Sequence, residues 1–185
     1  MTKISKIKFL TMQNIYKEKK IYGNSKTVIL EIETNNGIKG YGETYLSVYR
    51  AKEVKIFVNH IKDKIINKNI NEIDQIIFDL EEPFITQVGF AKSVISSVEI
   101  ALYDILSKHK KIPLCKLLNR NSKESVLAYC SSGPLSYSSK ILKKDTKEVV
   151  TQGFKAYKMR IGLNNWSSDL ERIHSAKKSL GNAKL

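Results

Sequence analysis

The stretch VILEIETNNGIKGYGE, residues 28–43, determines the first part of the fold. Val28, Leu30 and Ile32 share one face of residues 26–34 and Glu31 and Glu33 share the other, which is the period-two pattern of a half-buried β-strand. Asn35-Asn36-Gly37 predicts a hairpin turn, because Asn and Gly tolerate positive φ, and residues 38–44 form the return strand. Residues 3–10 also alternate. The chain is therefore predicted to open with a three-stranded antiparallel meander.

Helical spacing replaces this alternation after residue 47. Apolar residues recur at three- and four-residue steps from Val48 to Ile66, and again from Asn71 to the helix-stopping Pro83. The strongest pattern is the continuous apolar face from Phe90 to Leu106, which ends before Pro113. Three helices packed on a small sheet form an α+β unit.

The pattern changes again in the last third of the chain. Residues 126–132 and 154–161 are predicted strands, and each is followed by a helical segment. The connections are long enough for the two strands to pair in parallel. The polar stretch 119–125 separates this region from the α+β unit. We therefore expect two domains, covering residues 1–118 and 119–185.

Composition excludes several classes of protein. Of the 185 residues, 42% are hydrophobic, no apolar run reaches the length of a membrane span, and lysines interrupt the N-terminus where a secretory signal would need an apolar stretch. The net charge is +14, but the lysines are spread evenly and arginine is scarce, which favours a solvated surface over a specific nucleic-acid site. Two cysteines indicate a reduced, cytoplasmic protein.

The strand Gly153–Gly162 carries the clearest candidate chemistry. Lys158 and Arg160 share one face of this strand, since side chains alternate between faces. An exposed edge strand with solvated charges is favoured by spacing alone, and a site for a carboxylate or enolate is the alternative. The glycines of residues 37–42 resemble a dinucleotide fingerprint only superficially, because no helix follows the hairpin that contains them.

Three stretches together resemble the enolase superfamily, in its mandelate racemase and muconate lactonizing enzyme branch. Thr34–Glu43 is similar to the T-x-x-G-x-x-G-x-G-E signature of the capping domain. Ser97–Leu106, followed by Ile112-Pro113-Leu114, resembles the long helix that leads into the barrel. Gly153–Gly162 resembles the second barrel strand, with its Lys-x-Lys or Lys-x-Arg pair. The order and spacing of the three agree, so the resemblance spans nearly the whole chain.

The resemblance implies a capping domain, a TIM-type (β/α) barrel, a Mg²⁺ site and removal of the proton α to a substrate carboxylate. It places Lys158 beside that carboxylate and Arg160 where the family usually has a general base. Arginine stays protonated, so an acid-sugar dehydratase is favoured over a racemase, an epimerase or a cycloisomerase. Tyr22 and Tyr49 fall in capping segments that contact substrate in the family, although exposed tyrosines with no role are the alternative.

A complete barrel takes about 250 residues, and residues 126–185 provide only two strand–helix units. We therefore expect an incomplete barrel that stops before the strands carrying the metal ligands, and no turnover by this chain alone. The expected partner is a small carboxylate such as a sugar acid, and homo-oligomeric assembly is left open. A basic binding module or a non-catalytic remnant is the alternative from a different class.

Overall fold

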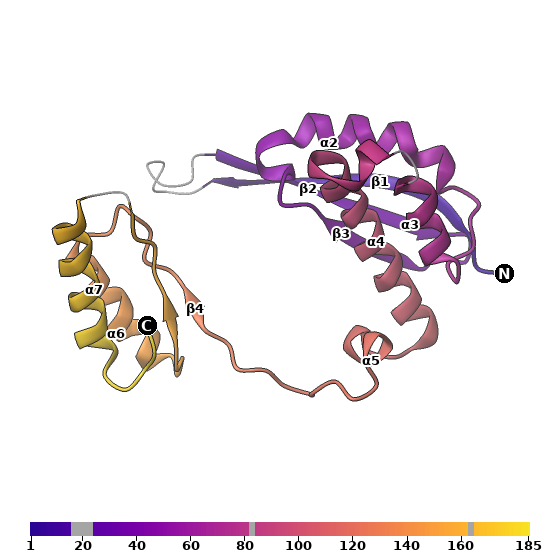
Figure 1. Ribbon diagram of the computed structural model, residues 1–185. Helices are drawn as coiled ribbons and strands as arrows, with labels where there is room; N and C mark the ends of the chain where they lie inside the picture. Colours follow the sequence, from indigo (N-terminus) through magenta and orange to yellow (C-terminus); the bar gives the residue numbers. More distant parts are fainter. Residues whose placement is uncertain (16–23, 82–83, 163–164) are drawn as a thin grey trace. The chain divides into compact units, whose positions relative to one another are not determined.

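The computed structural model describes residues 1–15, 24–81, 84–162 and 165–185 (Figure 1). The chain divides into two compact units, Met1–Ser122 and Lys123–Leu185. In the described part of the chain, no helix has the length and apolar character that crossing a bilayer requires.

The first unit is built on an antiparallel sheet of three strands in the order β1-β2-β3. Their bounds are Ile4–Ile15, Asn24–Thr34 and Lys39–Glu43. The predicted turn closes with Gly37 at φ +82°, while the Thr34 hydroxyl accepts the N–H of Ile38 at 3.0 Å. The predicted meander is confirmed, although β1 and β2 extend further than their alternating patterns indicated.

The three predicted helices follow the sheet in order, and a short fourth helix that was not predicted comes after them. They are α2 (Ser47–Ile61), α3 (Ile73–Glu81), α4 (Gly89–Lys110) and α5 (Leu114–Leu118), with 3₁₀ turns at Lys62–Lys64 and Phe84–Gln87. The predicted helix over residues 48–66 is too long, because the backbone tightens into the 3₁₀ turn after Ile61. Helix α4 is capped at its C-terminal end by Lys111, which adopts the left-handed conformation at φ +55°.

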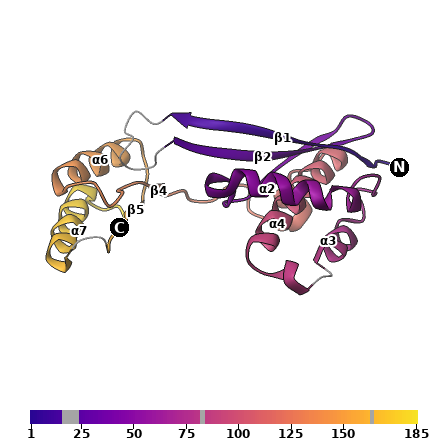
Figure 2. The same ribbon diagram turned by 90° about the horizontal axis from the view of Figure 1, so that it is seen from above.

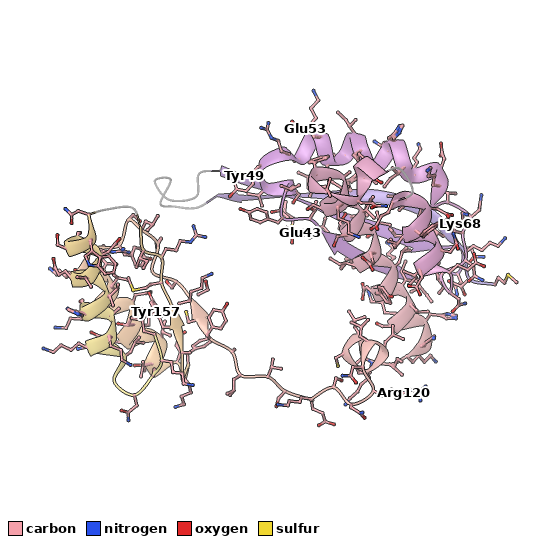
Figure 3. All side chains as sticks on the ribbon, in the orientation of Figure 1. Glu43, Tyr49, Glu53, Lys68, Arg120 and Tyr157 are labelled. Carbon is pink, nitrogen blue, oxygen red and sulfur yellow. The ribbon has the colours of Figure 1, made fainter. Side chains whose placement is uncertain are left out.

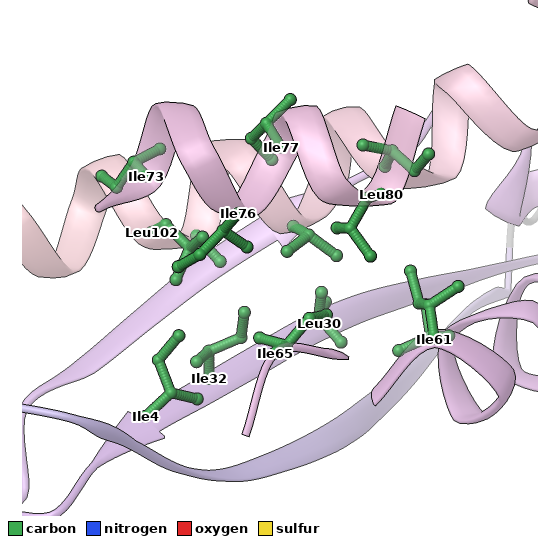
Figure 4. Close-up of a cluster of buried hydrophobic side chains, with 14 of the residues drawn as sticks. Ile4, Leu30, Ile32, Ile61, Ile65, Ile73, Ile76, Ile77, Leu80 and Leu102 are labelled. Carbon is green, nitrogen blue, oxygen red and sulfur yellow. The ribbon is translucent and has the colours of Figure 1, made fainter. Parts of the chain in front are cut away.

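One apolar core holds the first unit together (Figure 4). Leu30 and Ile32 share a face of β2, and they pack with Ile61 of α2, Ile76 of α3 and Leu102 of α4. The three helices therefore cover the same face of the sheet, as Figure 2 shows. These five side chains are each at most 6% exposed, so their burial supplies the main stabilising term of this unit.

The second unit is a strand–helix–strand–helix arrangement. Its elements are β4 (Cys130–Ser131), α6 (Ser139–Thr151), β5 (Tyr157–Lys158) and α7 (Trp166–Leu180). Strands β4 and β5 pair in parallel, with Cys130 opposite Tyr157 and Ser131 opposite Lys158. The predicted parallel pairing is confirmed. The regular strands are much shorter than predicted, because the side chains from Val126 to Tyr129 are exposed and the ladder begins only at Cys130.

A second parallel neighbour lies on the other edge of β5. The N–H of Tyr157 donates to the carbonyl of Lys184 and the N–H of Lys184 donates to the carbonyl of Lys155, both at 2.9 Å. On the opposite edge, the carbonyls of Ala156 and Lys158 accept N–H groups of the β4 segment. Segment 155–158 therefore lies between two parallel neighbours, as the second strand of a parallel barrel does.

Candidate functional site

The two faces of β5 have different environments. Tyr157 is 3% exposed and packs with Val149 of α6 and Leu180 of α7, so its side chain points toward the helices. Figure 3 labels this side chain. Lys158 and Arg160 alternate with it and are both exposed. The two predicted cations therefore share the face of the strand that is turned away from α6 and α7.

In a parallel barrel the helices pack against the outer face, and the face of β5 that carries the two cations is the one opposite the helices. The backbone that carries the cations is held by the neighbouring segment. The carbonyl of Lys158 accepts the N–H of Ser132 at 3.1 Å, and the N–H of Arg160 donates to the carbonyl of Gly133 at 2.9 Å. The ladder thus continues past β5 to Arg160.

Gly133 lets the two segments approach at this point. Its φ is +59°, and an added Cβ would lie 2.7 Å from Cβ of Met159 and 2.9 Å from the Tyr157 hydroxyl. A side chain at this position would therefore clash with the strand that carries Lys158 and Arg160. The glycine is required both by its left-handed conformation and by this close packing.

A polar cluster lies on the helix side of the same strand. The Tyr157 hydroxyl donates to the carboxylate of Asp145. Burial raises the pKa of Tyr157, and the hydrogen bond to Asp145 raises it further. Burial also raises the pKa of the Cys130 thiol. A thiol with a raised pKa is a weak nucleophile at neutral pH, so Cys130 acts here as a packed side chain.

The predicted substrate contacts of the capping domain are only partly described. Tyr49 lies at the start of α2 and is 66% exposed. Its ring packs edge-on against Tyr45, with 5.5 Å between the ring centroids and 3.2 Å between the hydroxyl oxygens. Figure 3 shows Tyr49 at one end of the first unit. Tyr22 lies outside the described residues.

The enolase-superfamily resemblance implies a Mg²⁺ site, which would need metal-ligating side chains close together. Mg²⁺ is held in proteins mainly by carboxylate oxygens. Among residues 1–15, 24–81, 84–162 and 165–185, no group of three or more His, Cys, Asp or Glu side chains could hold a metal ion. The described residues do not form a magnesium site, so no step of the chemistry is assigned to a metal here.

No sequence pattern singled out the best-buried polar pair of the second unit. Asp169 and Arg172 of α7 are 2% and 3% exposed and form an ion pair of 2.9 Å. Their i, i+3 spacing indicates an ion pair on a helix, but exposed ion pairs have the same spacing, so the sequence does not show that this pair is buried. Their burial becomes evident only when the two strand ends are in place.

The comparisons with known proteins agree with these features. Residues 19–119 match the N-terminal domain of the mandelate racemase / muconate lactonizing enzyme family. The arabinonate dehydratase of Saccharolobus solfataricus is 32% identical over 159 residues, a match that covers 83% of this chain and 42% of that protein. The L-talarate/galactarate dehydratase of Salmonella typhimurium is 28% identical over 159 residues, covering 83% of this chain and 39% of that protein. Relatives with lower identity include an epimerase and a cycloisomerase.

Solved structures match the fold over nearly the whole chain. The crystal structure of the Salmonella typhimurium dehydratase, liganded with Mg and L-lyxarohydroxamate, superposes with a TM-score of 0.83 at 24% identity. That match covers 97% of this chain and 49% of the dehydratase chain. The chain thus spans about two fifths of the length of the curated relatives reported above.

Proposed function

Because this chain belongs to the mandelate racemase / muconate lactonizing enzyme family of the enolase superfamily, we propose that it forms the capping domain and the first strands of an acid-sugar dehydratase. The observation that carries the proposal is the placement of Lys158 and Arg160 on the face of β5 turned away from the helices. The dehydratases among its relatives support the choice of reaction.

Lys158 and Arg160 bind the substrate carboxylate in this proposal. Two residues along a strand span about 7 Å, so the two side chains can approach one carboxylate from both sides. The lysine ammonium supplies a compact charge, and the guanidinium supplies two parallel N–H donors. Neutralising a carboxylate also favours loss of the proton on the adjacent carbon, because negative charge then develops on the carboxylate oxygens.

Arg160 does not remove that proton. A guanidinium stays protonated at any working pH and is a poor base, so the base is a group other than Arg160. Loss of the α-proton together with hydroxide from the neighbouring carbon gives an enol, which becomes a 2-keto acid. One base suffices for this elimination, whereas racemisation needs a proton donor on each face of the substrate.

The epimerase and the cycloisomerase among the relatives support a second candidate within the same superfamily. In a protein that contains a complete barrel, solvent deuterium separates the two activities. An epimerase or racemase incorporates deuterium at the α-carbon without loss of water, while a dehydratase forms a 2-keto acid with deuterium at the adjacent carbon.

Binding of galactarate tests the proposed roles directly. We expect millimolar or tighter binding by the purified chain, measured by NMR titration. Lys158→Met and Arg160→Met should each weaken it about tenfold, as expected for loss of one charge-assisted hydrogen bond. Lys155→Met is the matched control, because Lys155 is exposed on the same segment but alternates to the other face. Equal affinity of all four proteins, or no binding by the unmodified chain, would overturn the proposed site.

Tyr49 extends the proposal to the capping domain, with its exposed hydroxyl as a donor to a substrate hydroxyl. We expect Tyr49→Phe to reduce turnover in a protein that contains a complete barrel. For the chain alone, we expect no formation of 2-keto acid from galactarate or arabinonate in a buffer containing Mg²⁺. Turnover by the chain alone would refute that expectation while supporting the reaction class.

A basic binding module is the candidate from a different class, and the net charge of +14 is the feature that favours it. Such a module would bind nucleic acid with an affinity that depends on base sequence and survives moderate salt. We expect instead weak binding that falls steeply as salt is raised, because the lysines act as a general positive surface.

A further inference from the structure

One buried ion pair in the second unit forms hydrogen bonds to the segments that follow both strands. Arg172 and Asp169 belong to α7, and their side chains are only 4% and 3% exposed. Taking two charges out of water costs several kcal/mol per ion unless hydrogen bonds satisfy the remaining donors and acceptors. Such a pair needs partners, and the structure shows which groups these are.

Backbone carbonyls from both strand ends surround the guanidinium. Nε of Arg172 donates to the carbonyl of Tyr137 at 2.9 Å and Nη2 donates to that of Pro134 at 3.0 Å. Both carbonyls lie in the segment that follows β4. Nη1 donates to the carbonyl of Arg160 at 3.1 Å, in the segment that follows β5, and to Asp169 at 2.9 Å.

Asp169 completes the arrangement on the β5 side. Its second carboxylate oxygen accepts the N–H of Gly162 at 2.7 Å. Gly162 has φ +102°, a conformation in which a side chain would be strained. The carbonyl of Arg160 and the N–H of Gly162 are therefore both held by the same ion pair, while the N–H of Arg160 is held by Gly133.

Stability alone does not account for this choice of residues. Replacing a buried ion pair by apolar side chains of similar volume is often neutral or stabilising. What an apolar pair cannot do is fix three carbonyls and one N–H in a defined arrangement. The planar guanidinium, with its rigid set of donors, is suited to that task, and a lysine ammonium is not.

We propose that Arg172 and Asp169 are positioning residues that fix the backbone at Arg160, from which the guanidinium of Arg160 extends toward a substrate carboxylate. The inference rests on the proposed function for its purpose, but the positioning itself can be measured without any ligand. Arg172 links the segments after β4 and β5, and Asp169 holds the N–H of Gly162, two residues after Arg160. The backbone at Arg160 is then pre-organised, which reduces the ordering cost of binding an anion.

Amide hydrogen exchange on the full chain tests the positioning. In Arg172→Lys and in Asp169→Asn we expect the N–H groups of Arg160 and Gly162 to exchange at least about tenfold faster than in the unmodified chain. The N–H of Leu142 in α6 should stay within about twofold. Lys178→Gln is the control, since Lys178 is exposed on the same helix. Equal acceleration at all three N–H groups would assign the pair a general stabilising role, and no acceleration would also overturn the proposal.

Galactarate titration of the same variants separates this inference from the proposed function. We expect Arg172→Lys and Asp169→Asn to weaken binding several-fold. If Lys158→Met weakens binding as expected while both α7 variants bind normally, the carboxylate site stands and the positioning role is refuted. If neither the chain nor its variants bind galactarate, the proposed function fails. Faster amide exchange confined to the N–H groups of Arg160 and Gly162 would still support the positioning role, and its absence would refute that role.

Discussion

Gly42 of β3 lies directly against the carbonyl oxygen of Ser97 in α4: an added Cβ would be 1.8 Å from that oxygen. Gly40 has the same relationship to the carbonyl oxygen of Ala101, at 2.1 Å. No real side chain fits at such distances. The two glycines therefore allow the third strand and the longest helix of the first unit to pack backbone against backbone.

Gly42→Ala should destabilise the first unit by about 3 kcal/mol or more, because the strand must move away from α4 to admit the methyl group. Urea unfolding followed by circular dichroism measures the change. Gly37→Asn is the matched control: its φ of +82° is tolerated by Asn, and nothing lies within 4 Å of the added Cβ. We expect the control to lose less than about 1 kcal/mol. A Gly42→Ala protein as stable as the control would disprove the packing argument.

Glu31 makes the first unit sensitive to acid. Its side chain is 7% exposed and pairs with Lys39 at 3.3 Å. Burial alone would raise the pKa of Glu31, but hydrogen bonds from Lys39 and Tyr41 and the charge of Lys39 outweigh it, so the pKa is lowered from 4.5. A lowered pKa means that the stabilisation is present above about pH 4.5 and is lost as the pH falls through the pKa of the folded state.

Glu31→Gln should therefore reduce the acid sensitivity of the first unit. We expect the fall in melting temperature between pH 7 and about pH 3.5 to be smaller in this variant than in the unmodified chain. Glu43→Gln serves as the control, because Glu43 is exposed at the end of β3 and forms none of these contacts. An identical fall in all three proteins would show that another carboxylate dominates the acid limb.

The first unit was predictable because its patterns are local. The turn at Gly37 and the apolar face of α4 follow from the period of hydrophobic residues and from turn chemistry, which need no distant partner. The close approach of Gly40 and Gly42 to α4 was not predictable from local patterns, because it depends on a helix about 60 residues further along the chain. Those two glycines serve the packing of the hairpin against α4.

The second unit was predictable in topology but not in detail. Parallel pairing followed from the alternation of strands and helices. Regular strand structure, however, needs backbone hydrogen bonds to a neighbouring strand, and among the described residues the backbone from Val126 to Tyr129 has none. The shared face of Lys158 and Arg160 followed from the strand period. The role of Arg172 was not predictable from the sequence, because it donates to backbone carbonyls more than ten residues away and no pattern of side chains indicates such contacts.

Limited proteolysis should distinguish the two units. Arg120 and Lys123 are exposed in a segment without regular structure, so we expect trypsin to cut there first. The first unit has a continuous core shared by the sheet and α2, α3 and α4, whereas the second has a small cluster around Tyr157. The fragment from the first unit should persist while that from the second is degraded. Mass spectrometry of a time course identifies both, and equal survival would contradict the difference in core size.

Tyr157 should make the second unit sensitive to alkali. Burial and the hydrogen bond to Asp145 raise the pKa of its hydroxyl above the ordinary 10.0. A raised pKa means that the stabilisation is complete below about pH 10 and is lost as the pH rises toward the pKa of the folded state.

Tyr157→Phe should cost about 1 kcal/mol at neutral pH and make the stability of this unit less dependent on pH between about pH 9 and 11. Urea unfolding across that range measures both effects, with Tyr129→Phe as the exposed control. If the two variants show the same pH dependence, the hydrogen bond between Tyr157 and Asp145 does not set the alkaline limit of the fold.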